Sequence, residues 1–320
     1  MKAVVTHQYG DSTVLRIEEV TKPRITPDAA KRLSNRVLIK VHATTVNPID
    51  WKLRSGKFRL MPGNKLPLIL GFDVCGEVVE VGSAVTRFQV GDRVYGTVGL
   101  PGGADAEYTT AVADWLAMAP ANLTDEEAAA VPGSALTALQ ALRNVAQLQA
   151  GQSVLINGAS GGVGSFAVQI GKVLGAEVTG VCSTPNLELV KSLGADRTID
   201  YTQADFTDER SRYDIIFDTV AKRSFSECQP ALKPHGTYIT TLPSGKLILQ
   251  QILTAIFPGK KVKFVIQTPS GKDLVYLKEL LEAGKIRVIV DRVYPLTELA
   301  AAHKYSESGH AVGKIVIAIA

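Results

Sequence analysis

The stretch from Ser153 to Tyr201 constrains the fold more than any other part of this sequence. It opens with a short apolar run, Ser153–Asn157, that is typical of a buried strand. A glycine-rich turn follows, then an apolar pattern at helical spacing that ends at Gly175, and then a strand pattern over Glu177–Cys182. This order predicts the opening βαβ unit of a dinucleotide-binding domain, with a plain tight turn as the alternative.

The glycine turn reads Gly158-Ala159-Ser160-Gly161-Gly162-Val163-Gly164. Gly158 suits the tight turn off the strand, and Gly161 and Gly162 let the backbone approach a pyrophosphate closely. Gly164 lets the helix pack closely on the sheet, and the start of the helix offers free N–H groups to phosphates. We therefore expect the cofactor to contact Gly158, Ser160, Gly161, Gly162, Val163 and Gly164.

The end of the second strand bears on the choice of cofactor. NAD-binding proteins usually carry Asp or Glu about 20 residues beyond the glycines, where it binds the ribose 2′-hydroxyl. This sequence has Ser183, Thr184 and Asn186 there, with Pro185 and without a carboxylate. Thr184 is expected to cap a helix whose first residue is Pro185. The three polar residues favour NADPH, although the absence of Arg and Lys weakens that preference.

Composition bounds the class of protein. The 320 residues, 46% of them hydrophobic, suffice for two domains, and a net charge of +4 does not argue for a nucleic-acid partner. The three cysteines are scattered, which is typical of a reducing compartment. The chain starts directly in a strand pattern, without a signal peptide or a transmembrane run, so we expect a cytoplasmic location.

The chain divides into a β-rich part and an α/β part. Residues 1–124 contain strand patterns at Arg36–Ala43, Cys75–Val81 and Asp92–Val98, and a surface loop or short helical insertion at Thr26–Asn35. Pro132 and Gly133 break the Ala- and Leu-rich segment that follows, so that a helix is expected over Ser134–Asn144. Further strand patterns occur at Arg197–Tyr201, Tyr213–Asp218, Gly236–Leu242 and Val262–Gln267. With the first two they complete a six-stranded doubly wound sheet. The later patterns are a helix over Asp273–Ala283 and strands at Arg287–Tyr294 and Gly313–Ile319.

Several motifs carry a family resemblance over nearly the whole chain. They are Val46-Asn47-Pro48-Ile49-Asp50-Trp51-Lys52, Gly71-Phe72-Asp73-Val74-Cys75-Gly76, Gly91-Asp92-Arg93-Val94-Tyr95-Gly96, Ala130-Val131-Pro132 with Leu136-Thr137-Ala138, the glycine turn, and Gly313-Lys314-Ile315. The sequence resembles the zinc-free medium-chain dehydrogenase/reductase superfamily in its quinone oxidoreductase branch. It is similar to chloroplast-envelope-type quinone oxidoreductases and to alkenal/enone reductases.

The resemblance implies an α/β protein of two domains with an active cleft between them. A GroES-like β-barrel catalytic domain spans residues 1–124 and 270–320, and a Rossmann NADP-binding domain with a doubly wound parallel sheet spans 125–269. If the source is a plant, it also implies plastid or envelope association without a cleavable presequence.

Neither catalytic-zinc position of the related alcohol dehydrogenases is kept. Val46-Asn47-Pro48 matches the stretch in which they have a Cys, and Gly71-Phe72-Asp73 matches their Gly-His-Glu. Three dispersed cysteines also cannot build a four-cysteine structural zinc lobe. We therefore expect no metal. Hydride transfer to a conjugated acceptor fits best, because its delocalised product anion needs no Lewis acid.

The resemblance suggests site residues. Lys52 is expected to bind the substrate carbonyl or the nicotinamide ribose, with a solvated surface lysine as the alternative, and Asn47 to orient the ring or a water molecule. Tyr95 is expected to line the pocket or donate its hydroxyl, with core packing left open. Asp50 and Asp73 read as structural. The remaining expected cofactor contacts are Thr137, Tyr201, Thr219, Val220, Leu242, Val265 and Lys314, the last with a local salt bridge as the alternative.

The predicted function is an NADPH-dependent oxidoreductase acting on quinones or on the C=C bond of α,β-unsaturated carbonyls. The alternative is a cofactor-binding regulatory or RNA-binding protein of the zeta-crystallin type with little turnover. We expect a monomer or homodimer without a nucleic-acid partner. The apolar run Leu247–Phe257, followed by Lys260-Lys261, fits a dimer interface, a domain interface or a peripheral membrane contact. The five histidines read as ordinary surface or barrel residues.

Overall fold

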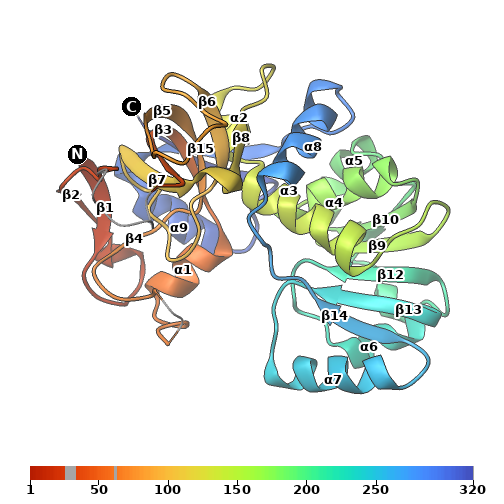
Figure 1. Cartoon of the computed structure of the whole chain (residues 1–320). Helices are drawn as coiled ribbons and strands as arrows, with labels where there is room; N and C mark the ends of the chain where they lie inside the picture. The colour runs from red at the N-terminus through yellow and green to blue at the C-terminus, as the bar shows by residue number, and fades with distance from the viewer. Residues whose placement is uncertain (26–33, 61–62, 320) are drawn as a thin grey trace. The chain divides into compact units, whose positions relative to one another are not determined.

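The structure, a computed structural model, describes residues 1–25, 34–60 and 63–319 (Figure 1). The prediction for Thr26–Asn35 falls mainly on residues 26–33, which lie outside the described part. The chain forms two compact units. Unit 1 comprises Met1–Gly133, Pro269–Gly284 and Val288–Ala320, and unit 2 comprises Ser134–Thr268 and Lys285–Arg287.

Unit 2 is built on a parallel six-stranded sheet, as the sequence predicts. Its strands are β9 (Ser153–Asn157), β10 (Glu177–Cys182), β11 (Arg197–Asp200), β12 (Tyr213–Asp218), β13 (Leu232–Thr240) and β14 (Lys261–Phe264). Their order is β11-β10-β9-β12-β13-β14, with parallel pairing throughout. This is the strand order of a Rossmann fold, whose direction of winding reverses between β9 and β12. Ligands bind such sheets outside the carboxyl ends of the strands near that point.

Helices cover both faces of this sheet because the direction of winding reverses between β9 and β12 and crossovers between parallel strands keep one hand. Figure 1 shows α4 (Gly162–Val173) and α5 (Leu187–Ser192) on one face, and α6 (Phe225–Cys228) and α7 (Gly245–Ile256) on the other. Short 3₁₀ turns are η4 (Thr184–Asn186), η5 (Phe206–Asp208) and η6 (Gln229–Ala231). The face that carries α6 and α7 buries a core of Leu155, Val181, Ile216, Tyr238 and neighbouring apolar side chains.

Helix α3 (Pro132–Leu139) begins two residues earlier than predicted. The predicted break in the Ala- and Leu-rich segment is present between α2 (Asp125–Ala129) and α3, but Pro132 and Gly133 belong to the second helix rather than preceding it. Proline is well tolerated in the first turn because its missing N–H needs no partner there. The Gly133 N–H donates to the Asp73 carboxylate at 2.7 Å. The helix then widens into a π-helical segment, η3 (Gln140–Val145).

Unit 1 is β-rich. Over the described residues, one sheet has the order β15-β16-β3-β5-β6-β8, with β7 also paired to β3, and a smaller sheet has the order β2-β1-β4. The strands are β1 (Lys2–Thr6), β2 (Arg16–Glu19), β3 (Arg36–Val46), β4 (Leu68–Ile69), β5 (Asp73–Val81), β6 (Arg93–Thr97), β7 (Tyr108–Val112), β8 (Leu116–Met118), β15 (Val290–Pro295) and β16 (Lys314–Ala318). The α-helices are α1 (Pro48–Arg54), α2 (Asp125–Ala129), α8 (Gly271–Glu282) and α9 (Leu299–Glu307). The 3₁₀ turns are η1 (Ser12–Val14), η2 (Ala113–Trp115) and η7 (Leu296–Glu298).

The compact units and the predicted domains differ at their boundaries. Residues 125–133, assigned to the second domain from sequence, lie in unit 1. Asp125 of α2 is held there by Arg93, whose Nε donates at 2.6 Å. Lys285–Arg287 lie in unit 2. The amide of Gln169 there both accepts from the Arg287 N–H at 2.8 Å and donates to its carbonyl at 3.0 Å.

Candidate functional site

The glycine turn lies between β9 and α4, where the sequence predicts it. Gly158 has φ +83°, a left-handed conformation that favours glycine. The Gly161 N–H donates to the Gly158 carbonyl at 3.1 Å and closes the turn. A Cβ atom on Gly164 would collide with the Gly158 carbonyl oxygen. Gly164 therefore allows α4 to start directly against the turn.

The start of α4 leaves backbone donors for a ligand. Thr124, Ser224, Ser244 and Ser270 each cap a helix by accepting an N–H, whereas the N-cap of α4, Gly161, has no side chain to do so. Among the described residues, a Cβ on Gly161 would meet only the Gly158 carbonyl oxygen, at an ordinary 3.5 Å. Packing within the protein therefore does not require this glycine. Uncapped N–H groups beside an open Gly161 fit the pyrophosphate of a dinucleotide.

The segment after β10 differs from the prediction in its cap. Ser183 is the N-cap residue of η4, and Thr184 is its first residue. The expectation that Thr184 is the capping residue is wrong, because Ser183 holds that position. The Thr184 hydroxyl donates to the Asp200 carboxylate at 2.5 Å. The Asn186 amide donates to the Ser183 hydroxyl at 3.1 Å. Residues 181–186 contain no carboxylate, but parallel pairing sets Asp200 of β11 beside Cys182.

The other expected cofactor residues of unit 2 follow the ends of its strands. Tyr201 follows β11, Thr219 and Val220 follow β12, Leu242 follows β13, and Val265 follows β14. Parallel strands end at one edge of the sheet, so the fold brings these residues to the edge that carries the glycine turn. Tyr201, Val220 and Leu242 are exposed, whereas Val265 is buried. Thr137 lies half-buried on α3.

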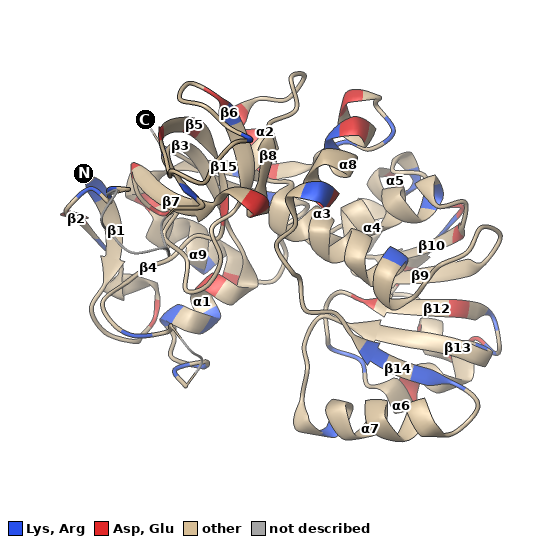
Figure 2. Cartoon of the chain, viewed as in Figure 1, with Lys and Arg blue, Asp and Glu red and all other residues tan. Residues whose placement is uncertain are grey.

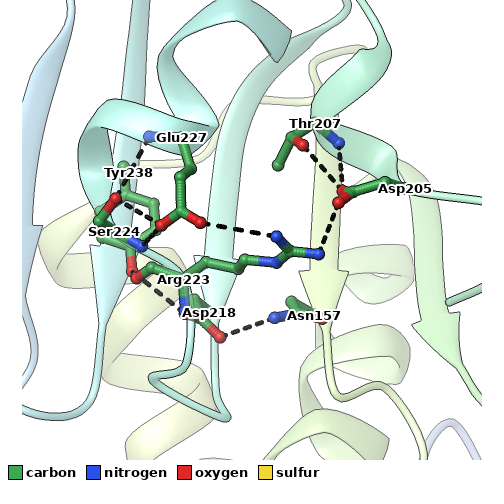
Figure 3. Close-up of polar contacts among 8 residues, drawn as sticks. All are labelled: Asn157, Asp205, Thr207, Asp218, Arg223, Ser224, Glu227 and Tyr238. Carbon is green, nitrogen blue, oxygen red and sulfur yellow. Dashed lines mark hydrogen bonds and ion pairs between the residues drawn. The ribbon is translucent and has the colours of Figure 1, made fainter.

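Sequence reasoning missed a buried carboxylate at the end of β12 (Figure 3). The Asp218 side chain accepts bonds from the Asn157 amide at 2.8 Å and the Tyr238 hydroxyl at 3.1 Å. It also accepts the backbone N–H groups of Val220, Ala221 and Arg223 at 3.0–3.2 Å. These bonds fold residues 219–223 around one side chain, so Asp218 fixes a loop at the expected cofactor edge.

Arg223 extends this network across the surface of unit 2 (Figure 3). Its guanidinium lies 2.7 Å from Asp205 and 3.6 Å from Glu227. Glu227 in turn closes the capping box of α6 with Ser224. Arg223 is therefore engaged by two carboxylates.

In unit 1, Asn47 and Asp50 form the start of α1. The Asp50 carboxyl accepts the N–H groups of Asn47 at 2.7 Å and Gly71 at 3.1 Å. Burial raises the pKa of Asp50 to about 7, although these two bonds oppose the shift. The side chain thus ties the α1 turn to the segment before β5, which is the structural role expected for it.

Lys314 and Asp73 form a buried ion pair that holds Asn47. The Lys314 ammonium lies 3.2 Å from Asp73 and donates to the Asn47 side-chain oxygen at 2.6 Å. The Asn47 amide nitrogen donates to Asp73 at 3.0 Å and to Thr45 at 3.2 Å. The local salt bridge left open for Lys314 is thus present. The Asn47 amide is held by neighbouring side chains rather than pointing free.

Lys52 and Tyr95 have contrasting surroundings. Lys52 is half-buried on α1, with its ammonium 5.3 Å from the centre of the Trp51 ring. Burial, and then the charge of Lys57, lowers the pKa of Lys52. Tyr95 is fully buried, and its hydroxyl donates to the Leu274 carbonyl at 2.6 Å. Core packing, the alternative left open for Tyr95, describes this placement, which gives no support to the catalytic role.

The histidines and cysteines outside the expected site differ in burial. His7 and His42 pair with Glu18 and Asp125, whereas His303, unlike an ordinary surface histidine, is fully buried against Arg54. All three cysteines are buried. Residues 1–25, 34–60 and 63–319 contain no group of three or more His, Cys, Asp or Glu side chains that would hold a metal ion.

Helix α7 exposes one apolar face. The exposed side chains are Ile248, Leu249, Ile252, Leu253, Ile256 and Phe257. The helix packs beside β14, the edge strand of the sheet. A dimer contact and a membrane contact both stay predictions for this face. No helix in the described part of the chain has the length and apolar character needed to cross a membrane.

Models of two protein families match the chain. A model described as alcohol dehydrogenase GroES-like domain matches residues 34–121, and one described as zinc-binding dehydrogenase matches residues 193–317. Together with the parallel sheet and the glycine turn, these matches define a class of proteins that join a GroES-like domain to a Rossmann domain. The predicted fold class is confirmed.

Relatives narrow the class. The chain is 36% identical over 328 residues to a chloroplast envelope quinone oxidoreductase homolog of Arabidopsis thaliana, covering 99% of this chain and 98% of that protein. It is 38% identical to the chloroplastic NADPH-dependent alkenal/one oxidoreductase of Arabidopsis thaliana, covering 99% and 79%. The quinone oxidoreductase structure from Coxiella burnetii has a TM-score of 0.90 and 32% identity, covering 100% and 99%. The chain belongs to the medium-chain dehydrogenase/reductase superfamily, in its quinone oxidoreductase branch, whose members are nicotinamide-dependent oxidoreductases.

Proposed function

We propose that this protein uses NADPH to reduce quinones or the C=C bond of α,β-unsaturated carbonyls, without a metal ion. The observation that carries the proposal is the glycine turn, where an uncapped α4 and an open Gly161 fit a dinucleotide. A quinone oxidoreductase of Escherichia coli, solved in complex with NADPH, has a TM-score of 0.84 and 25% identity, covering 99% of this chain and 100% of that one. The relatives named as quinone and alkenal/one oxidoreductases supply the substrate classes.

The chain's own residues would bind and orient the reactants. When bound, the reduced nicotinamide supplies the hydride. The N–H groups at the start of α4 would hold the pyrophosphate. The Lys52 ammonium would donate to the substrate oxygen and stabilise the charge that develops there, and solvent would supply the proton. The Asn47–Asp73–Lys314 network would keep the start of α1, and with it Lys52, in one position.

Replacing Lys52 tests this role. We expect Lys52→Ala to lower enone turnover by about 10²–10³-fold, the usual effect of losing one donor to a developing oxyanion. NADPH affinity should change less, and a quinone acceptor should suffer less, because its product anion is better stabilised by delocalisation. Steady-state kinetics and separate calorimetric titration of NADPH distinguish these effects.

The matched control is Lys40→Ala, which removes an exposed lysine from β3 of the same unit. It should leave turnover and NADPH affinity unchanged. Enone turnover within about threefold of wild type in Lys52→Ala, far below the loss expected for a donor, would exclude a catalytic role. A loss confined to NADPH affinity would instead assign Lys52 to the ribose.

The regulatory or RNA-binding alternative has no comparable support. Figure 2 shows Lys and Arg interspersed with Asp and Glu in both units. Proteins that bind nucleic acid usually gather basic residues on one face or along one helix. The mixed pattern therefore favours a small-molecule substrate.

A further inference from the structure

Asp200, the last residue of β11, lies beside Thr184 at the point where the cofactor ribose is expected. Parallel pairing aligns Asp200 with Cys182, two residues before Thr184. One carboxylate oxygen accepts the Thr184 hydroxyl at 2.5 Å and the Gln203 amide at 3.1 Å. The other accepts the Thr202 N–H at 2.9 Å and the Thr202 hydroxyl at 2.8 Å. The bond from Thr184, followed by those from Thr202 and Gln203, lowers the pKa of Asp200.

The hydrogen bond from Thr184 to Asp200 determines what the Thr184 hydroxyl can offer a ligand. A threonine hydroxyl has one proton and two lone pairs. In Thr184 the proton is used on Asp200, so only lone pairs remain for a ligand. A ribose 2′-hydroxyl can donate to such an acceptor, whereas a 2′-phosphate, which accepts bonds, cannot.

The charge of Asp200 acts in the same direction. A phosphate monoester carries a charge of about −1.5 to −2 at neutral pH. The segment 183–187 contains no Lys or Arg to balance it. The nearby Lys191 lies 2.8 Å from Glu188, and Arg223 lies 2.7 Å from Asp205. A 2′-phosphate would therefore face an ionised carboxylate without a cation from this segment.

We propose that Asp200 is a specificity-determining residue that works against the 2′-phosphate. Acting directly and through Thr184, it limits the preference for NADPH over NADH, so that the protein accepts both cofactors. This inference rests on the proposed function, because it concerns the same cofactor. The inference attributes a weak preference between NADPH and NADH to a residue of β11. The usual acidic residue of NAD-binding proteins lies instead at the end of the neighbouring strand, which is β10 here.

The proposal is tested by calorimetric titration of NADPH and of NADH into the wild-type protein and into the Asp200→Asn variant. Asparagine keeps an oxygen for the Thr202 N–H, and its amide can donate to Thr184, which frees the threonine proton. We expect the ratio of NADPH to NADH affinity to rise by about 3–10-fold, mainly through tighter NADPH binding, as for a surface charge pair. The gain should shrink as salt is raised, because exposed charges are screened.

Two further variants keep the result specific. Asp208→Asn removes an exposed carboxylate of η5 and should leave the ratio unchanged, so an equal rise there would overturn the assignment to Asp200. Thr184→Val removes the acceptor for the 2′-hydroxyl and should weaken NADH binding more than NADPH binding. Agreement between this variant and Asp200→Asn supports the proposal, and unchanged ratios in both overturn it. If the wild-type protein binds neither cofactor, the proposed function itself fails.

Discussion

Asp73 of unit 1 and Asp218 of unit 2 are both fully buried, and their carboxylates are satisfied in different ways. Asp73 of unit 1 faces the Lys314 ammonium and accepts further bonds from Thr45, Asn47 and the Gly133 N–H. Within the described residues, the hydrogen-bond partners of Asp218 in unit 2 are all neutral donors: three backbone N–H groups, an amide and a phenol. In unit 1 an ammonium group thus faces the buried aspartate, whereas in unit 2 neutral hydrogen-bond donors surround the buried aspartate.

This difference in how the buried aspartates are satisfied predicts how substitutions will affect the stability of each unit. A buried ion pair joins two distant parts of the chain, so losing one partner leaves an uncompensated charge. Substituting a carboxylate that accepts several hydrogen bonds from neutral donors removes only some of those bonds. The loss of stability is then confined to the loop that the carboxylate organises. Both tryptophans, Trp51 and Trp115, lie in unit 1, so tryptophan fluorescence reports on that unit alone.

The largest effect is expected from Lys314→Met. Methionine keeps the volume but leaves the Asp73 carboxylate without a cation, so unit 1 should lose about 3–5 kcal/mol of unfolding free energy. Urea unfolding followed by tryptophan fluorescence measures this loss. Adding Asp73→Asn should recover part of it, because replacing both partners removes the buried charge. A loss below about 1 kcal/mol, the range of a surface ion pair, would contradict the role assigned to Lys314.

A smaller, local effect is expected from Asp218→Asn. The amide nitrogen of asparagine cannot accept, so some donors of the 219–223 loop are left without an acceptor, at a cost of about 1–3 kcal/mol. Hydrogen exchange should rise at Val220, Ala221 and Arg223 while the tryptophan-detected transition of unit 1 stays in place. If Asp218→Asn shifted the unfolding transition of unit 1 as much as Lys314→Met does, the prediction that the effect of Asp218 is local would be wrong.

The buried carboxyl of Asp105 sharpens the comparison, because within the described part of the chain it has neither a cation nor a full set of donors. Among the described residues, one side-chain oxygen of Asp105 has no hydrogen-bond partner. Burial, and then the charge of Asp50, raises the pKa of Asp105 well above its usual value. The folded protein therefore keeps a proton that the unfolded chain loses near pH 4, and this contribution to stability is lost as pH rises through the folded pKa.

Asp105→Asn removes that titration and should change how stability depends on pH. We expect the variant to gain at least about 1.4 kcal/mol relative to wild type between pH 4 and pH 8, the value of one pKa unit. Urea unfolding of both proteins at each pH measures the difference, and Asp208→Asn, which removes an exposed carboxyl, should show none. A constant difference across this range would show that Asp105 ionises normally.

The sequence predicted what depends on local pattern. Strands β9, β10 and β12 lie at the predicted residues, because buried strands and glycine turns are recorded in neighbouring positions. The pair Lys314–Asp73 joins residues 241 apart, and no local pattern selects one lysine as its partner. The sequence did not predict a role for Asp200, because strand register, rather than spacing along the chain, brings Asp200 close to Thr184. Tyr95 was placed on the correct strand, but only packing decides where its hydroxyl points.

The burial of the cysteines has a consequence for a protein proposed to handle enones. Such compounds are Michael acceptors, which are attacked by thiolates far faster than by thiols. Burial raises the pKa of Cys182 to about 11 and that of Cys228 to about 12, and it raises the pKa of Cys75 as well. At neutral pH all three sulfurs are protonated and shielded from solvent. The protein thus offers its proposed electrophilic substrates no activated thiol, and we expect its cysteines to resist alkylation during turnover.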